Sequence, residues 1–170
     1  MDIAGTPRFL LPGRQYETCL ARRGEKVPAP LLFSREAAEA LADLLLSVYP
    51  DGPVLFVGHG TDHPAGQRYA DFAARLRERG GRGFLGLLRG TPDFAAAAAW
   101  IEARGARRLT LVPLMMTAGR HARQDVCGQE EGSWRSRLTR LGLEVTPAAQ
   151  GIWALAAVRE LAERTESTKG

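Results

Sequence analysis

Three histidines occur in the sequence, and they fall in two short polar segments. His59 and His63 lie in GHGTDHP, and His121 lies in MMTAGRHARQD. Neutral imidazole is a good ligand for cobalt, nickel, iron or zinc, and it also accepts a proton near neutral pH. Because Pro64 disfavours helical backbone at His63, the two neighbouring histidines do not predict a helical metal-binding pair. From these residues alone, metal binding and an ordinary surface role for the histidines both remain open.

Each polar segment follows an apolar run that predicts a buried strand. Residues 53–57 (PVLFV) precede His59, and residues 108–114 (RLTLVPL) precede His121. Ligands of parallel α/β sheets collect at the carboxyl ends of the strands. We therefore expect both histidines at one edge of a sheet, where neighbouring strand ends bring them near each other.

Strands alternate with helices along the rest of the chain. Further strands are predicted at 83–88 and 143–147, and helices at 35–49, 66–79, 92–104, 133–141 and 152–163. Ser34 is expected to cap the first of these helices. Thr91 is expected to cap the third, with Pro92 at its first position. This alternation predicts a three-layer α/β/α fold with a mostly parallel, four-stranded sheet.

Residues 1–33 differ from the remainder because they contain four prolines and show no clear hydrophobic period. They are interpreted as a loop with one short helix near 14–23. The regular α/β domain is expected to occupy residues 34–165. The final residues, ERTESTKG, are expected to be frayed.

Composition limits the classes of partner. Hydrophobic residues make up 45% and charged residues 25%, with a net charge of +4, which is typical of a soluble globular domain with a mild preference for anions. A polycarboxylate small molecule fits this charge, whereas nucleic acid is disfavoured because no basic helix or aromatic-basic repeat stands out. No apolar run approaches the roughly 18 residues of a membrane span. Cys19 and Cys127 lack CxxC spacing, so a reduced, cytoplasmic protein is expected.

Two stretches resemble the C-terminal half of the CbiK-type anaerobic cobaltochelatases (sirohydrochlorin cobaltochelatases of the class II chelatase superfamily). They are VLFVGHGTDHPAGQRYADF and LVPLMMTAGRHARQDVCGQEEGSWRSRL, and the resemblance extends over about residues 31–160. It implies a lyase that inserts Co²⁺ into sirohydrochlorin in anaerobic cobalamin biosynthesis, with Co²⁺ as substrate metal and no organic cofactor. It also implies that His59 and His121 are the catalytic, metal-binding pair, and that the tetrapyrrole lies between two similar α/β halves.

The sequence departs from this family pattern in two places. Residues 1–33 are too short to replace an N-terminal half, so they are interpreted as its remnant or linker. The other side of the cleft is then expected from a homodimer or from a complementing N-terminal half. The second departure is Arg89, which stands where the family has a metal-site glutamate. A guanidinium does not ligate a cation and repels one nearby, but it does bind carboxylates.

Further side chains are candidates for substrate contact. Arg89 and Arg120 would bind carboxylate arms of the tetrapyrrole, Met115 would contact the macrocycle, and Glu130 would accept pyrrole protons. The plainer interpretations are solvated arginines, a solvated acidic turn that also includes Asp125 and Glu131, and core packing of Met115 with Met116.

Core packing is likewise favoured for Trp134 and Trp153, and a buried or loop role is favoured for Cys127. The alternative function is that of a non-catalytic half-domain that binds metal or tetrapyrrole without turnover.

Overall fold

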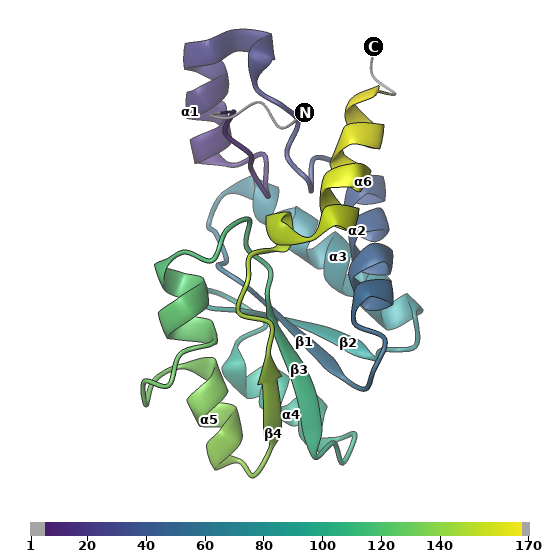
Figure 1. The fold of residues 1–170 in the computed structure, drawn as a ribbon, viewed down its shortest axis with the longest axis vertical. Coiled ribbons are helices and arrows are strands. Elements are labelled where there is room, and N and C mark those ends of the chain that lie inside the picture. Colours follow the sequence, from purple (N-terminus) through teal and green to yellow (C-terminus); the bar gives the residue numbers. More distant parts are fainter. Residues whose placement is uncertain (1–5, 168–170) are drawn as a thin grey trace.

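The computed structural model describes residues 6–167, with a four-stranded parallel sheet at its centre (Figure 1). The strands are β1 (Val54–Gly58), β2 (Gly83–Leu87), β3 (Arg108–Pro113) and β4 (Glu144–Pro147), in the order β2-β1-β3-β4. All three pairings are parallel, so the predicted α/β sheet is confirmed. β1 and β3, which precede the two histidine segments, are neighbours.

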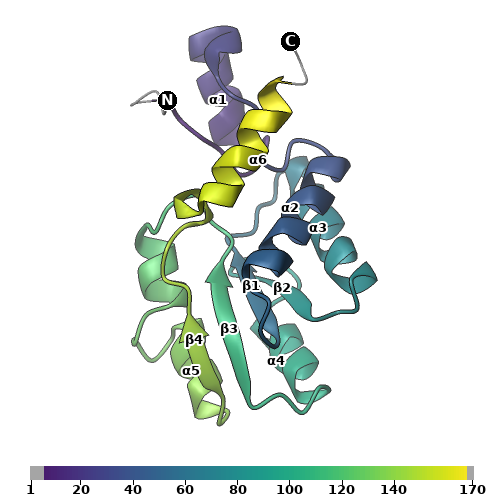
Figure 2. The same ribbon diagram turned by 45° about the vertical axis from the view of Figure 1, so that its right-hand side comes forward.

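Helices cover both faces of the sheet (Figure 2). One face carries α2 (Arg35–Val48), α3 (Gln67–Glu78) and α6 (Ala156–Ser167), and the other carries α4 (Phe94–Glu102) and α5 (Trp134–Arg140). The chain also forms α1 (Arg14–Arg23), the 3₁₀ turns η1 (Gly24–Lys26), η2 (Pro64–Gly66) and η4 (Ile152–Ala154), and the π-helix η3 (His121–Val126). All five residues of β1 are buried, because helices cover both faces of the sheet. The fold therefore has three layers.

The core consists of one apolar cluster on each side of the sheet. Phe56 of β1 and Phe72 of α3 are fully buried on one side and meet edge to face, with ring centroids 5.4 Å apart. Trp134 and Leu138 of α5 are buried on the other side. The sheet is thus fixed by packing from both faces, and its carboxyl edge is held rigidly for the loops that follow.

One predicted helix cap is confirmed and one is wrong. The Ser34 hydroxyl accepts a hydrogen bond from the Ala37 amide at 3.1 Å, as expected of a cap. Thr91 does not cap α4. The Asp93 carboxylate does so instead, accepting from the Ala96 amide at 3.0 Å, and the helix therefore begins later than predicted. The Pro92 carbonyl is occupied by the Leu87 amide, which keeps this turn outside the helix.

The C-terminal helix also differs from the prediction. A 3₁₀ turn comes first, and α6 then continues through Ser167, so the expectation of a frayed tail is wrong for residues 163–167. An ion pair between Glu166 and Arg8 anchors this last turn to the N-terminal segment. The remaining predicted tail residues, 168–170, lie outside the described part of the chain, as do residues 1–5.

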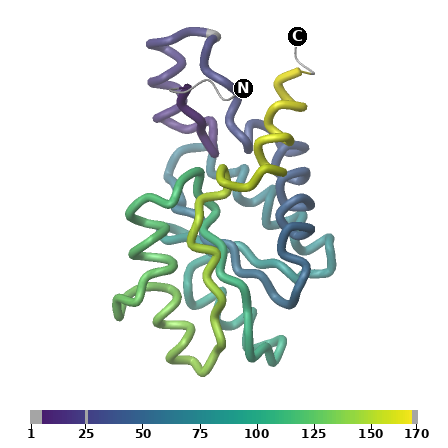
Figure 3. Tube along the Cα trace, in the orientation of Figure 1, coloured from purple at the N-terminus to yellow at the C-terminus, as the bar shows by residue number. Residues whose placement is uncertain are grey.

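The N-terminal segment contains the predicted short helix, α1, and lies at the end of the molecule toward which the strands point (Figures 2 and 3). Backbone amides of Leu31 and Leu32 donate to the carbonyls of Phe9 and Leu10, at 3.0 and 2.8 Å. These bonds fasten the segment to the chain just before α2. In the described part of the chain, no helix has the length and apolar character needed to cross a membrane.

Candidate functional site

His59 and His121 meet at the carboxyl edge of the sheet. His59 directly follows β1, and His121 begins the π-helix that comes after β3. Their ring centroids are 4.7 Å apart, with the ring planes at 69°. The adjacency of β1 and β3 therefore does bring together side chains that are 62 positions apart in the sequence, as the strand pattern predicts.

The backbone around His59 is tightly constrained. Gly60 has a φ of +83°, and a Cβ at this position would lie 1.8 Å from the carbonyl oxygen of Arg89. A Cβ at Gly58 would lie 2.8 Å from the ring of Tyr69. The Arg89 amide also donates to the carbonyl of His59 at 3.0 Å. Both glycines are thus required by close approach of neighbouring groups, and Gly60 also by its left-handed conformation.

On both imidazoles, a hydrogen bond engages Nδ1 and leaves Nε2 free. Nδ1 of His59 lies 3.1 Å from the carbonyl oxygen of Gly60, and Nδ1 of His121 lies 2.5 Å from Oδ2 of Asp125. A carbonyl or carboxylate oxygen only accepts, so each Nδ1 carries a hydrogen, and in the neutral ring Nε2 then keeps its lone pair. A histidine whose other nitrogen donates to a carboxylate is a typical metal-ligand arrangement.

The two rings border a cavity of about 730 Å³, which is within the usual range for a small-molecule site. Three segments line it: the loop after β1, the segment after β3, and residues 8–16 of the N-terminal segment. Among the residues that the structure describes, no three His, Cys, Asp or Glu side chains gather into a metal cluster. Two imidazoles, those of His59 and His121, are thus the histidine side chains that line this cavity in the described part of the chain.

The structure brings some of the predicted substrate residues to this cavity and not others. Met115 and Arg120 line it, and Met115 also packs against the core on the α4–α5 side. Arg89 and Glu130 are exposed and are not part of the lining. Only the backbone of Arg89 takes part in the site, through the contact with Gly60 that constrains His59.

The remaining histidine has a structural environment. Nδ1 of His63 accepts from the Ala65 amide at 3.1 Å, and its Nε2 lies 3.3 Å from a carboxylate oxygen of Glu17 on α1. His63 adopts an extended backbone conformation, as expected from Pro64. It therefore caps a turn and contacts α1, and it does not line the cavity.

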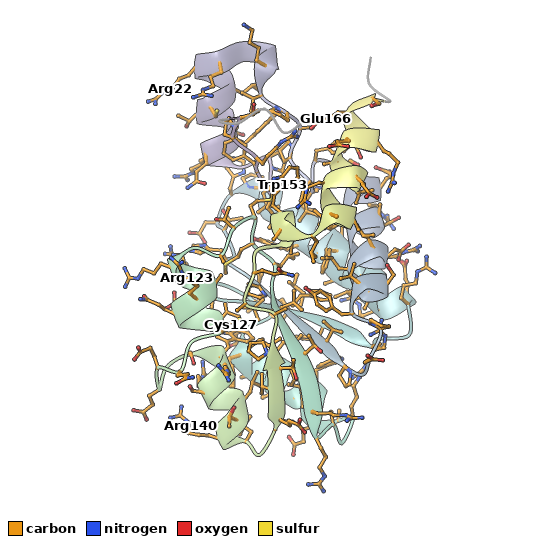
Figure 4. All side chains as sticks on the ribbon, in the orientation of Figure 1. Arg22, Arg123, Cys127, Arg140, Trp153 and Glu166 are labelled. Carbon is orange, nitrogen blue, oxygen red and sulfur yellow. The ribbon has the colours of Figure 1, made fainter. Side chains whose placement is uncertain are left out.

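Other candidates are packed or paired elsewhere. Cys127 is buried inside the domain, whereas Arg123 projects from its surface (Figure 4). Burial raises the pKa of the Cys127 thiol to about 11, which keeps it protonated and a poor ligand. Trp134 is buried in the core as predicted, and Glu131 pairs with Arg140.

Sequence reasoning missed two parts of the site. The first is residues 8–16, whose irregular pattern gave no sign that they face the histidines; the Pro12-Gly13 pair before a helix was the available signal. The second is Tyr69, which lies on the buried face of α3 and also lines the cavity. Burial raises the pKa of Tyr69, while hydrogen bonds from the Gly60 and His59 backbone act in the opposite direction. Tyr69 therefore contacts the backbone of the loop that carries His59 and helps to hold it in place.

A family model described as cobalt chelatase (CbiK) matches residues 33–164. The chain belongs to this cobalt chelatase family. The match includes both histidine segments and the whole sheet, so the arrangement of His59 and His121 lies within the family's domain.

Two curated relatives support the assignment. The chain is 34% identical over 164 residues to the sirohydrochlorin cobaltochelatase CbiKC of Nitratidesulfovibrio vulgaris, covering 88% of this chain and 58% of the relative. It is 27% identical over 172 residues to the sirohydrochlorin cobaltochelatase of Salmonella typhimurium, covering 94% of this chain and 65% of the relative. The chain thus spans less than two thirds of the length of either relative.

Proposed function

We propose that this chain inserts Co²⁺ into sirohydrochlorin, and that His59 and His121 bind the metal and take up a proton. The observation that carries the proposal is the pair of imidazoles, whose ring centroids are 4.7 Å apart and which both line a cavity of about 730 Å³. Both relatives are named sirohydrochlorin cobaltochelatases, which supports the choice of substrates.

Insertion exchanges two pyrrole N–H protons for one divalent metal ion. The Nε2 atoms would replace water in the coordination shell of Co²⁺ and hold the ion at the face of the macrocycle. Once the ion passes to the pyrrole nitrogens, the same lone pairs become available to accept a proton, and the second proton leaves through solvent. Nothing in this exchange requires an organic cofactor.

Asp125 has a positioning role in this proposal. Its carboxylate lies 2.5 Å from Nδ1 of His121, so it orients the ring and keeps Nε2 free.

Arg120 and Met115 would contact the tetrapyrrole, because both line the cavity. Arg89 and Glu130 remain predictions without support from their positions. The proposal also assigns the chain to anaerobic cobalamin biosynthesis in the cytoplasm.

The test is cobalt insertion followed by the absorbance change of sirohydrochlorin. His59→Ala and His121→Ala are each expected to slow insertion by at least about 100-fold, because the reaction loses a metal ligand and a proton acceptor together. His63→Asn is the matched control, since it replaces the third histidine with another good cap outside the cavity. Normal rates in both alanine variants would overturn the proposal.

Binding without turnover is the competing outcome. If the wild-type chain binds Co²⁺ and metal-free sirohydrochlorin but produces no cobalt complex, it is a non-catalytic binding half-domain. Sedimentation with and without sirohydrochlorin then tests whether a second copy of the chain is needed.

A further inference from the structure

Residues 8–16 share the cavity with the two histidines. Phe9, Leu10 and Leu11 line it together with Arg14 and Tyr16, while His59 and His121 line it from the carboxyl edge of the sheet. The cavity therefore lies between the N-terminal segment and the histidine loops. These N-terminal residues precede the part of the chain that the family model matches.

This segment is anchored at several points. Its backbone is hydrogen-bonded to residues 31 and 32, and the Phe9 and Tyr16 rings meet edge to face at 5.6 Å. The Arg8 guanidinium pairs with Glu166 and lies 5.0 Å from the ring centroid of Trp153, both at the C-terminal end of the described chain (Figure 4). The segment is thus held by ordinary tertiary contacts, as a wall of a binding site must be.

The charge of the cavity is one-sided. Arg8, Arg14 and Arg120 line it, and its described lining contains no Asp or Glu. Arg8 is neutralised by Glu166, and Arg120 contacts only the neutral amide of Gln124, at 3.0 Å. Among residues 6–167, Arg14 has neither an ion-pair nor a hydrogen-bond partner from its side chain. Within residues 6–167, two cationic side chains, Arg14 and Arg120, one on each side of the cavity, are therefore left without a counter-charge.

An apolar surface edged by unpaired arginines suits a flat apolar molecule that carries carboxylates at its rim. A guanidinium binds a carboxylate through two parallel N–H···O bonds, which a single ammonium cannot reproduce. Phe9, Leu10, Leu11 and Met115 provide the apolar contact, and Arg14 and Arg120 provide the charge.

We propose that residues 8–16 form the second wall of the tetrapyrrole site, and that Arg14 on this wall binds a substrate carboxylate while Arg120 binds another from the histidine side. The inference rests on the proposed function, because it requires a tetrapyrrole polycarboxylate in the cavity.

The experiment titrates the full chain with metal-free sirohydrochlorin and follows its fluorescence. Arg14→Gln is compared with Arg22→Gln, which removes the same charge from the same helix at a position outside the cavity lining (Figure 4). Arg14→Gln is expected to raise the Kd about tenfold, as for the loss of one charge-assisted pair, and Arg22→Gln to leave it within about twofold. Arg14→Lys should restore part of the affinity, because it keeps the charge but not the paired geometry.

In the insertion assay, Arg14→Gln should raise the KM for sirohydrochlorin and leave kcat nearly unchanged. His59→Ala should do the reverse and still bind the metal-free tetrapyrrole. Equal affinities for Arg14→Gln and Arg22→Gln, with tight binding by the wild type, would overturn this inference and leave the proposed function intact. Failure of the wild type to bind sirohydrochlorin would overturn both.

Discussion

The two walls of the cavity are built in different ways. The histidine wall rests on buried parallel strands, and its backbone approaches so closely that glycines are required at Gly58 and Gly60. The N-terminal wall packs Leu10 and Leu11 against the core, but it ends in α1, a helix with no buried residue, and is otherwise tied to the domain by hydrogen bonds and ion pairs. One wall is built on the core strands themselves, and the other is attached to the surface of the core.

This difference matches the different demands of metal handling and substrate binding. Two imidazoles act as a pair only if their spacing is held closely, which the packed strand ends provide. Carboxylates on flexible arms are bound well by an exposed arginine that adjusts to them. We therefore expect changes in the histidine wall to affect folding or the chemical step, and changes in the N-terminal wall to affect substrate affinity.

The largest loss of stability should come from a substitution at Gly60 in the histidine wall. A Cβ there would lie 1.8 Å from the Arg89 carbonyl oxygen, in a left-handed backbone conformation. Gly60→Ala is expected to lower the free energy of unfolding by about 3 kcal/mol, from steric overlap and backbone strain together. Denaturant unfolding measures this loss.

Gly90→Ala is the control for backbone strain alone. Gly90 also has a positive φ, +89°, but a Cβ there has nothing within 4 Å. This variant should lose only about 1 kcal/mol and keep its insertion activity. Equal losses in the two variants would show that the contact with Arg89 does not constrain the His59 loop.

A smaller effect is expected from Asp125→Asn, which tests whether the Asp125 carboxylate positions the His121 ring. Asparagine preserves the size of the side chain but removes the charge next to Nδ1 of His121. Insertion should slow by about tenfold, as is usual when the partner of a metal-binding histidine is replaced, and stability should hardly change because both side chains are exposed. Steady-state kinetics with varied Co²⁺ measures the effect. Unchanged kinetics would show that the His121–Asp125 contact has no part in the reaction.

Local rules predicted most of what positions the histidines. Apolar runs located the strands, and glycines and Pro64 indicated the turn that presents His59. The Asp93 cap was missed because the Thr-Pro pair before it fits the same helix-start rule. The π-helix that places Asp125 against His121 was missed because its sequence shows no distinct pattern.

The second wall could not be predicted for a different reason. Its position depends on long-range contacts, such as Arg8 with Glu166 and Phe9 with Leu31, which leave no periodicity in the sequence. Residues 8–13 were interpreted as loop and residues 14–16 as the start of a short helix, and both interpretations are correct. What the sequence did not reveal is which surface this loop covers.

The smallest effect, confined to stability, is expected at a charge cluster away from both walls. Asp43 of α2 accepts paired hydrogen bonds from Arg75 of α3 and from Arg79, which directly follows α3, at 2.6 to 2.9 Å. None of the three lines the cavity. Hydrogen bonds from Arg79 and then Arg75 hold the pKa of the Asp43 carboxyl well below its usual range. Asp43→Asn should lower the free energy of unfolding at pH 7 by about 1 kcal/mol, because the groups are partly exposed and screened by solvent.

The pH dependence of this loss follows from the sign of the pKa shift. A carboxyl whose pKa is lowered by folding stabilises the protein above its unfolded pKa, near 4, and loses that contribution as pH falls toward the folded value. The difference between wild type and Asp43→Asn should therefore be constant above about pH 5 and shrink in more acidic solution. At each of these pH values, wild type and Asp43→Asn should bind sirohydrochlorin with the same affinity. A difference in affinity between the two proteins would mean that Arg75 and Arg79, which are paired with Asp43, also contribute to substrate binding. Substrate binding would then not depend on an arginine that lacks a partner within residues 6–167, such as Arg14.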